Sequence, residues 1–263
     1  MLLLAALVTA SWLAGCSSRP GHPVAEQAQA WELAKARPSP QGSSERSPAP
    51  AVPPVPQETV AQAAEQGCTT TAVQGLSQQI IAESNCLMPG AYVPVPRLPN
   101  MKLAPAVLPY LASPARDALV EAASRSGAVE LAIGSMLRTL PQQFLVHEWY
   151  RAGRCGIDLA APPGRSNHES GLAIDVADPA RWRWRLRQAG FRWFGRSDRW
   201  HFDYVGPEAG RHRGLDVRAF QRLWNRNNPE DKIREDGELD AATEERLRAA
   251  PARGFGRGPS CGG

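Results

Sequence analysis

Apolar side chains recur three and four positions apart in several stretches of the chain, a spacing typical of helices with one buried face. Val217, Phe220, Leu223 and Trp224 form one such stripe. Residues that favour helix starts, such as Ser followed by Pro or a single Asp, precede several of these stretches. We therefore predict helices over residues 72–83, 113–125, 141–151, 178–190, 217–224 and 240–247.

Other stretches show the alternation that is typical of strands. Val129, Leu131 and Ile133 alternate with Glu130 and Ala132, which predicts a half-buried strand. Three further short strands are predicted over residues 172–176, 191–194 and 200–205. Because helices and strands do not alternate regularly, the pattern favours an α+β fold with an antiparallel sheet flanked by helices.

The first sixteen residues form an apolar run that is too short to span a bilayer as a helix. The run is typical of an export signal, and it ends in Leu-Ala-Gly-Cys, which resembles the box of bacterial lipoproteins. The resemblance implies that Cys16 is acylated, and that a lipid anchors the exported chain to the cell envelope, facing the periplasm or cell wall. The alternative is an uncleaved apolar N-terminus with an incidental cysteine.

The composition then changes twice along the chain. Pro, Ser, Gln and Ala dominate residues 17–67, which we predict to be a disordered tether. The whole chain has 263 residues, of which 43% are hydrophobic, so one or two domains with a real core are expected. We assign residues 68–212 to the main domain and residues 213–263 to a small helical module.

The net charge of +4 and the pI near 9.0 are mild. They fit an anionic partner such as a cell-wall polymer. No run of basic residues interleaved with aromatic residues is present, and we therefore expect no nucleic-acid partner.

Cysteine content predicts disulfides. Cys68, Cys86, Cys155 and Cys261 remain after the lipidation candidate, an even number in a chain that is expected in an oxidising compartment. Three pairings are possible. Proximity in the sequence favours Cys68–Cys86, and hence Cys155–Cys261. A metal role is not expected, because no C-x-x-C spacing occurs.

Two histidines and an aspartate lie in short strand-like contexts. His168, Asp175 and His201 form a ligand set for zinc with one coordination position left open. Asp198, three residues before the second His, is placed to act as a general base. Arg138, just after a predicted strand, is placed to stabilise an oxyanion or to hold a substrate carboxylate.

Three motifs carry a resemblance to a known family. The pattern Ser-x-His-x-x-Gly-x-Ala-x-Asp over residues 166–175, followed by Asp-x-Trp-His over residues 198–201, resembles the zinc D-alanyl-D-alanine carboxypeptidases of VanY type. The wider family also holds L-alanyl-D-glutamate endopeptidases. The segment Ser-x-Leu-Arg-Thr with a later Gln, over residues 135–143, looks like another family motif, and Trp-His-Phe-Asp-Tyr-Val-Gly over residues 200–206 is similar to a third.

The resemblance covers roughly residues 105–206 and implies a hedgehog-like DD-peptidase fold with one zinc ion per chain. It gives Arg138 the substrate and oxyanion role and places Gln143 with it in substrate binding. Two positions depart from the carboxypeptidase pattern. Asp198 stands where VanY-type enzymes carry Glu, whereas the endopeptidase branch uses Asp, and Leu137 replaces an aromatic residue.

Several neighbouring residues have two open interpretations. Ser166 either binds substrate or supports a ligand, or it is a turn residue. Trp200 either lines the peptide groove or packs in the core. Glu169 is expected to be solvated.

The segment over residues 217–247 looks like a peptidoglycan-binding helical repeat. Together these observations predict a monomeric, lipid-anchored hydrolase, a zinc D-alanyl-D-alanine carboxypeptidase that acts on peptidoglycan stem peptides. The alternatives are an L-alanyl-D-glutamate or cross-link endopeptidase, and a non-catalytic, zinc-containing lipoprotein that binds the cell wall.

Overall fold

The structure, a computed structural model, describes residues 57–207, 209 and 212–261. The predicted export signal, Cys16 and most of the predicted tether lie outside the described residues. Among the helices that are described, none has the length and apolar character needed to cross a bilayer.

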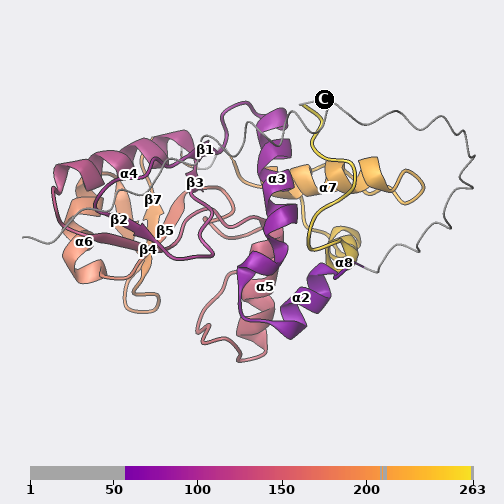
Figure 1. The fold of residues 1–263 in the computed structure, drawn as a ribbon, viewed down its shortest axis with the longest axis horizontal. Coiled ribbons are helices and arrows are strands. Elements are labelled where there is room, and N and C mark those ends of the chain that lie inside the picture. Colours follow the sequence, from indigo (N-terminus) through magenta and orange to yellow (C-terminus); the bar gives the residue numbers. More distant parts are fainter. Residues whose placement is uncertain (1–56, 208, 210–211, 262–263) are drawn as a thin grey trace, which may run out of the picture. The chain divides into compact units, whose positions relative to one another are not determined.

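Most helices begin where the sequence predicts them to begin. Asp178 and Asp240 cap their helices by accepting hydrogen bonds from the backbone N–H three residues later. Ser113 is the first residue of its helix, and the cap is Ala112. The helices are α2 (Val60–Gln66), the 3₁₀ helix η2 (Thr70–Val73), α3 (Gln74–Leu87), α4 (Ser113–Arg125), α5 (Leu140–Arg151), α6 (Pro179–Gln188), α7 (Leu215–Asn227) and α8 (Ala241–Ala249) (Figure 1).

In the described part of the chain, seven short strands form two sheets. The strands are β1 (Val93–Pro94), β2 (Met101–Leu103), β3 (Tyr110–Leu111), β4 (Leu131–Ser135), β5 (Ala173–Val176), β6 (Phe191–Trp193) and β7 (His201–Tyr204). The larger sheet has the order β2-β4-β5-β7-β6, and β1 pairs with β3. The predicted α+β class is confirmed.

The larger sheet is mixed, so the prediction of an antiparallel sheet is wrong at one edge. Strands β4, β5, β7 and β6 are antiparallel neighbours, but β2 runs parallel to β4. Helix α4 lies between β2 and β4 in the chain. A crossover through a helix returns the chain in its original direction, which produces a parallel pair.

Helices α4 and α6 pack against this sheet (Figure 1). Their shared core contains Leu119 of α4, Trp182 of α6, Ile174 of β5 and Phe202 of β7, all fully buried. The indole N–H of Trp182 donates to the carbonyl of Glu130, so its polar atom is satisfied inside the core. This core fixes the strands that carry the candidate ligands.

A second core joins helices from both ends of the described chain. It contains Val60 of α2, Leu76 of α3, Phe144 of α5, Phe220 of α7 and Leu247 of α8. Part of the range predicted as a tether is therefore helical, because α2 covers this core. The helices assigned to the small C-terminal module bury their apolar faces in the same core.

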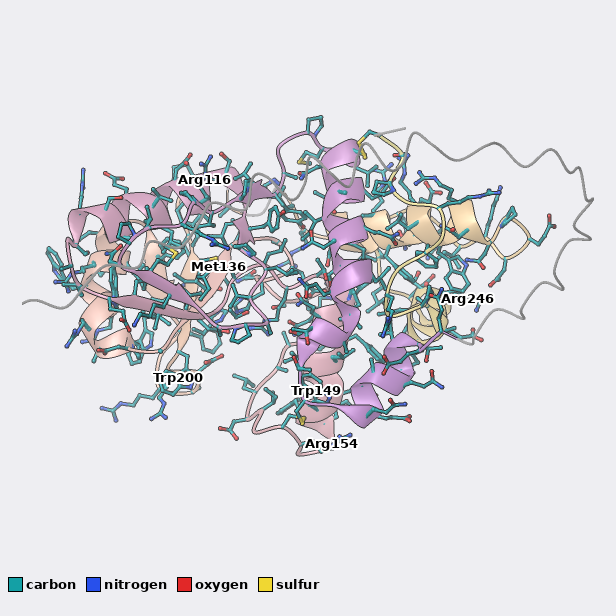
Figure 2. The ribbon with its side chains drawn as sticks, viewed as in Figure 1. Arg116, Met136, Trp149, Arg154, Trp200 and Arg246 are labelled. Atoms are coloured by element: carbon teal, nitrogen blue, oxygen red, sulfur yellow. A yellow bond between two sulfur atoms is a disulfide. The ribbon has the colours of Figure 1, made fainter. Side chains whose placement is uncertain are left out.

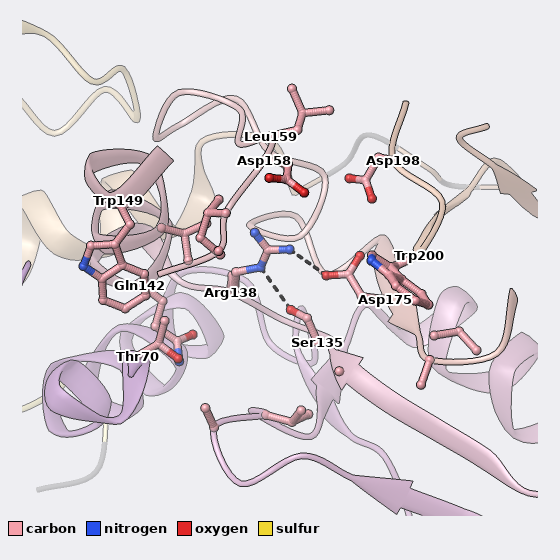
Figure 3. Close-up of a pocket in the computed structure, with 18 of the residues that line it drawn as sticks. Thr70, Ser135, Arg138, Gln142, Trp149, Asp158, Leu159, Asp175, Asp198 and Trp200 are labelled. Carbon is pink, nitrogen blue, oxygen red and sulfur yellow. Dashed lines mark hydrogen bonds and ion pairs between the residues drawn. The ribbon is translucent and has the colours of Figure 1, made fainter. Parts of the chain in front are cut away.

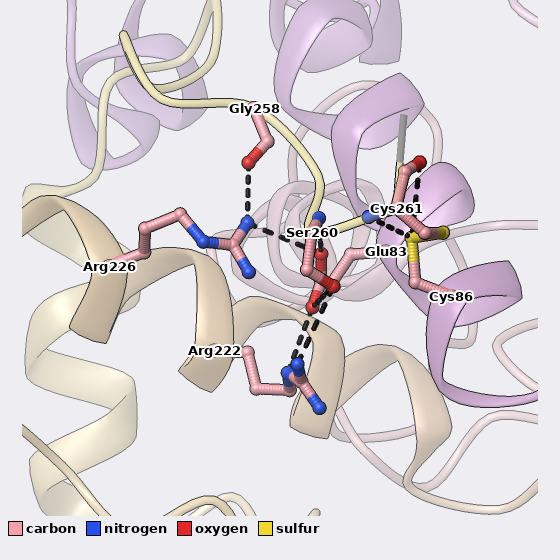
Figure 4. Close-up of a disulfide and its surroundings, with 7 residues drawn as sticks. All are labelled: Glu83, Cys86, Arg222, Arg226, Gly258, Ser260 and Cys261. Atoms are coloured by element: carbon pink, nitrogen blue, oxygen red, sulfur yellow. Dashed lines mark hydrogen bonds and ion pairs between the residues drawn. A yellow bond between two sulfur atoms is a disulfide. The ribbon is translucent and has the colours of Figure 1, made fainter. Parts of the chain in front are cut away.

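The four cysteines of the described residues form two disulfides, as predicted, but the predicted pairing is wrong. The bonds join Cys68 to Cys155 and Cys86 to Cys261, with Cα–Cα distances of 5.3 and 5.4 Å; the second is shown in Figure 4. Helix α3 separates Cys68 from Cys86, and its 14 residues span about 20 Å at 1.5 Å per residue. A disulfide requires Cα atoms within about 7 Å of each other, so neighbours in the sequence cannot pair here.

Candidate metal centre

Three predicted ligands meet at one point of the larger sheet. Asp175 of β5 stands directly opposite His201 of β7 in the antiparallel pair, and His168 reaches them from the turn before β5. Nε2 of His168 lies 3.1 Å from Nδ1 of His201 and 3.3 Å from Oδ1 of Asp175. Nδ1 of His201 lies 3.2 Å from the same oxygen. The prediction that these residues form one cluster is confirmed.

The size of this triangle fits a metal ion. In a tetrahedral site with bonds of about 2.0–2.1 Å, ligand atoms are about 3.3 Å apart. The three donor pairs, separated by 3.1–3.3 Å, have this spacing. The group could therefore hold a metal ion through two nitrogens and one oxygen, with a fourth position open.

The turn that carries His168 has a tightly fixed backbone. Gly171 has φ +66°, and a Cβ at this position would lie 2.6 Å from the backbone nitrogen of Ala112. That N–H donates to the carbonyl of Gly171 at 2.9 Å. Only glycine permits both this conformation and this close approach, which anchors the turn to the start of α4.

The prediction that Glu169 is solvated is wrong. Its carboxylate is buried and accepts hydrogen bonds from the N–H groups of Gly164 and Ser166. The carboxylate of Glu169 thus provides hydrogen-bond acceptors for two backbone N–H groups of this loop that have no partner in a strand. Burial and the nearby carboxylate of Asp216 raise the pKa of Glu169 well above its usual value.

A hydrogen bond selects the nitrogen of His168 that faces the cluster. Its Nδ1 lies 2.7 Å from the carbonyl oxygen of Met136. A carbonyl only accepts, so Nδ1 carries the proton and Nε2 faces the cluster with its lone pair. Burial and the charge of Arg138 lower the pKa of His168 to about 4, which keeps the ring neutral at physiological pH, as a metal ligand must be.

Unlike His168, His201 is protonated at neutral pH when no metal is bound. Burial lowers its pKa, but hydrogen bonds to Asp175 and Asp203 outweigh burial and raise the pKa to about 9. Burial likewise opposes ionisation of Asp175, but His168, His201 and Arg138 hold its pKa well below the usual range. At neutral pH the cluster therefore contains a carboxylate, a neutral imidazole and an imidazolium.

A metal ion must displace the extra proton of His201, so metal affinity should depend on pH. Because this pKa is raised to about 9, we expect the apparent affinity to rise about tenfold per pH unit between about pH 6 and pH 8, and to level off above about pH 9. A histidine of ordinary pKa, about 6.5, would level off near neutrality. Titration calorimetry at pH 7 in buffers of different ionisation enthalpy should show release of about one proton. An affinity that is constant from about pH 7 to pH 8.5 would contradict this charge state.

A cavity of about 850 Å³ opens beside the cluster. Asp175, Arg138, Asp198 and Trp200 line the part near the ligands (Figure 3). This part brings together the predicted base, the predicted cation and one predicted ligand. Trp200 is 42% exposed and lines the cavity, so it does not pack in the core. That it contacts a peptide stays a prediction.

The cavity continues away from the cluster towards helix α5. Thr70, Gln142 and Trp149 line this part, whereas Asp158 and Leu159 of the loop before the site lie nearer to Arg138 and Asp198 (Figure 3). Trp149 comes from α5, whereas Trp200 comes from the segment before β7 (Figure 2). At about 850 Å³, the cavity lies within the size range of ligand-binding sites.

Arg138 is held by three side chains. Its guanidinium donates to Oδ2 of Asp175 at 2.9 Å, to Oγ of Ser135 at 3.0 Å and to Oε1 of Gln143 at 3.1 Å. Gln143 is fully buried, and its amide N–H donates to the carbonyl of Ala161. Gln143 is not among the residues that line the cavity; it fixes the direction of Arg138.

Ser166 also lies outside the cavity lining. Its hydroxyl accepts a hydrogen bond from the backbone N–H of His168 at 3.3 Å. This bond fits both a turn residue and a residue that supports the candidate ligand His168, so the role of Ser166 stays a prediction.

Asp198 lines the cavity and is not one of the three clustered candidate ligands. Burial and the charge of Asp175 raise the pKa of Asp198 from its ordinary value. A raised pKa makes a carboxylate a better proton acceptor at neutral pH.

Two acidic residues at the site do not belong to the predicted set. Asp158 shares the cavity with Asp198 and Arg138 (Figure 3), but the sequence shows it only as one acid in a loop. Asp203 lies behind His201. The sequence could have indicated Asp203, because it lies two residues after His201 on a predicted strand and such residues share a face of the sheet.

No protein-family model matches the chain, and no curated protein matches its sequence.

Proposed function

We propose that this chain is a zinc metallopeptidase of the hedgehog-like DD-peptidase fold, and that it removes the terminal D-alanine from peptidoglycan stem peptides. The observation that carries the proposal is the triangle of His168, Asp175 and His201 beside a cavity that also holds Asp198 and Arg138. Two imidazole nitrogens and one carboxylate oxygen at tetrahedral spacing are a donor set that suits zinc.

When bound, zinc lowers the pKa of a water molecule towards neutrality and polarises a carbonyl group. Asp198 accepts the proton of the attacking water and returns it to the leaving amine. Its position on the cavity wall and its raised pKa support this role.

Arg138 binds the free carboxylate of the terminal residue or stabilises the developing oxyanion. Its contacts with Ser135, Asp175 and Gln143 hold the guanidinium in one orientation at the cavity wall. A fixed guanidinium suits this task, because it loses little further freedom when substrate binds.

A second candidate function is an endopeptidase that cleaves an L-alanyl-D-glutamate bond or a cross-link. Two observations favour it: the base is Asp rather than Glu, and the cavity extends from Trp200 to Thr70 and Trp149. A cavity of this length can bind peptide residues on both sides of a cleaved bond. The candidate from another class is a non-catalytic, zinc-containing lipoprotein that binds the cell wall.

Digestion of purified muropeptides, followed by mass spectrometry, separates these functions. The carboxypeptidase should remove one D-alanine and should fail on substrates whose terminal carboxylate is amidated, because Arg138 then loses its charged partner. An endopeptidase should cleave internally and tolerate amidation. Intact muropeptides after incubation with the zinc-loaded protein would leave only the binding lipoprotein.

The proposed location is the cell envelope, through a lipid on Cys16. The two disulfides support a compartment that is oxidising. The proposed partners are stem peptides and the membrane, with the chain acting as a monomer. Binding of peptidoglycan by residues 213–263 stays a prediction.

A further inference from the structure

Asp203 connects the two segments that carry the histidine ligands. Its side chain is buried, and one oxygen, Oδ1, lies 2.8 Å from Nε2 of His201 and 2.8 Å from Nδ2 of Asn167. Asn167 directly precedes His168 in the turn before β5. A single carboxylate oxygen therefore contacts both the ligand strand and the ligand turn.

The geometry of β7 makes this contact possible. His201 and Asp203 are two residues apart on one strand, so their side chains lie on the same face of the sheet. Across the ladder, Asp175 stands opposite His201, and Ala173 stands opposite Asp203. Asn167 reaches Asp203 from the turn before β5 and donates its amide N–H to Oδ1.

The contact decides which nitrogen of His201 can bind a metal. An imidazole has two ring nitrogens, and a hydrogen bond to one of them presents the other to the ligand cluster. Here Nε2 faces Asp203, and Nδ1 faces the other two donor atoms at 3.1 and 3.2 Å. A ring flip that brought Nε2 to the cluster would break the bond to Asp203.

We propose that Asp203, itself held by Asn167, is a positioning residue that selects Nδ1 of His201 as the metal-binding atom and so increases the affinity of the centre. This inference rests on the proposed zinc centre, but not on the peptidase reaction. Carboxylates that accept a hydrogen bond from a metal-bound histidine orient the ring and make it a stronger ligand.

The test compares Asp203→Ala, Asp203→Asn and Asn167→Ala in the full chain. Zinc affinity is measured by competition with a chelator of known affinity. We expect Asp203→Ala to weaken zinc binding about 10–100-fold. Asp203→Asn should lose less, because an amide oxygen still accepts the bond, and Asn167→Ala should shift affinity in the same direction.

A second readout reports the coordinating atom directly. In the zinc-loaded wild-type protein, ¹⁵N NMR of the histidine side chains should show a proton on Nε2 of His201 and none on Nδ1. Asp203→Asn should keep this pattern. In Asp203→Ala, His201 should bind zinc through either ring nitrogen, so the proton should no longer be confined to Nε2. Circular dichroism without metal checks that each variant is folded, and Asp117→Ala, an exposed acid on α4, is the charge-matched control.

The inference fails if Asp203→Ala binds zinc as tightly as the wild type and keeps Nδ1 of His201 as the ligand atom. That result leaves the peptidase proposal intact. Conversely, a wild-type protein that binds zinc but cleaves no muropeptide contradicts the proposed function alone, since neither readout requires hydrolysis.

Discussion

Replacement of Asp198 by alanine should lower kcat for the proposed hydrolysis of stem peptides by about 10²–10⁴-fold, the usual contribution of a general base, while zinc stays bound. Asp198 lines the cavity but is not one of the three clustered ligands. Its removal therefore takes away a proton acceptor without opening the metal centre. The measurement is initial-rate kinetics on a synthetic stem peptide, with the zinc content of the same samples determined by atomic emission.

The pH profile sharpens this test. The pKa of Asp198 is raised by burial and by Asp175, and a general base acts only when ionised. With zinc saturating, activity of the wild type should fall as the pH drops through the pKa of Asp198; a bound zinc ion favours the ionised carboxylate, so this limb should lie at a lower pH than the metal-free site would give. Asp198→Ala should lack this acidic limb, and Asp117→Ala should keep it. If kcat of Asp198→Ala exceeds a tenth of the wild-type value, Asp198 is not the general base.

The parts of the site that the sequence predicted are those fixed by short-range spacing. His168 and Asp175 belong to one turn-strand unit, and Asp198 and His201 to another. Pairing of β5 with β7 places Asp175 opposite His201, and the short turn before β5 brings His168 to the same place. The helix caps at Asp178 and Asp240 were predictable for the same reason, because capping depends on a side chain and a backbone N–H three residues away.

The parts that could not be predicted depend on contacts between distant segments. Strand β2 has three residues and lies in the sheet because of its parallel partner β4, not because of its own pattern. Glutamate is usually a surface residue. Glu169 can be buried because two backbone N–H groups of the turn donate hydrogen bonds to its carboxylate. The length of α3 excludes only the Cys68–Cys86 pairing, which the helix predicted over residues 72–83 already argued against. The choice between the two remaining pairings depends on how distant segments pack.

A second large effect is expected outside the candidate metal centre, at the fully buried Glu83 of α3. Its carboxylate accepts from Nε of Arg222 at 2.9 Å, and Arg226 approaches at 3.4 Å. Ser260 donates both its backbone N–H and its hydroxyl, at 2.6 and 3.0 Å (Figure 4). The neighbouring disulfide between Cys86 and Cys261 holds the same C-terminal segment to the same helix.

The double variant Arg222→Ala/Arg226→Ala should lower the free energy of unfolding by about 3–5 kcal/mol, the cost of leaving a buried charge uncompensated. Both arginines are partly exposed, at 31% and 26%, which favours the lower end of this range. Urea unfolding with the disulfides intact measures the loss. Arg125→Ala, which breaks an exposed ion pair with Glu121, is the matched control and should cost less than about 1 kcal/mol.

Adding Glu83→Gln to the double variant separates charge from packing. A neutral amide of similar shape removes the uncompensated charge, so it should restore part of the lost stability, whereas in the wild-type background the same substitution should destabilise. If Glu83→Gln destabilises both backgrounds equally, the arginines contribute through packing rather than charge. A loss below about 1 kcal/mol in the double variant would place this cluster with ordinary surface ion pairs.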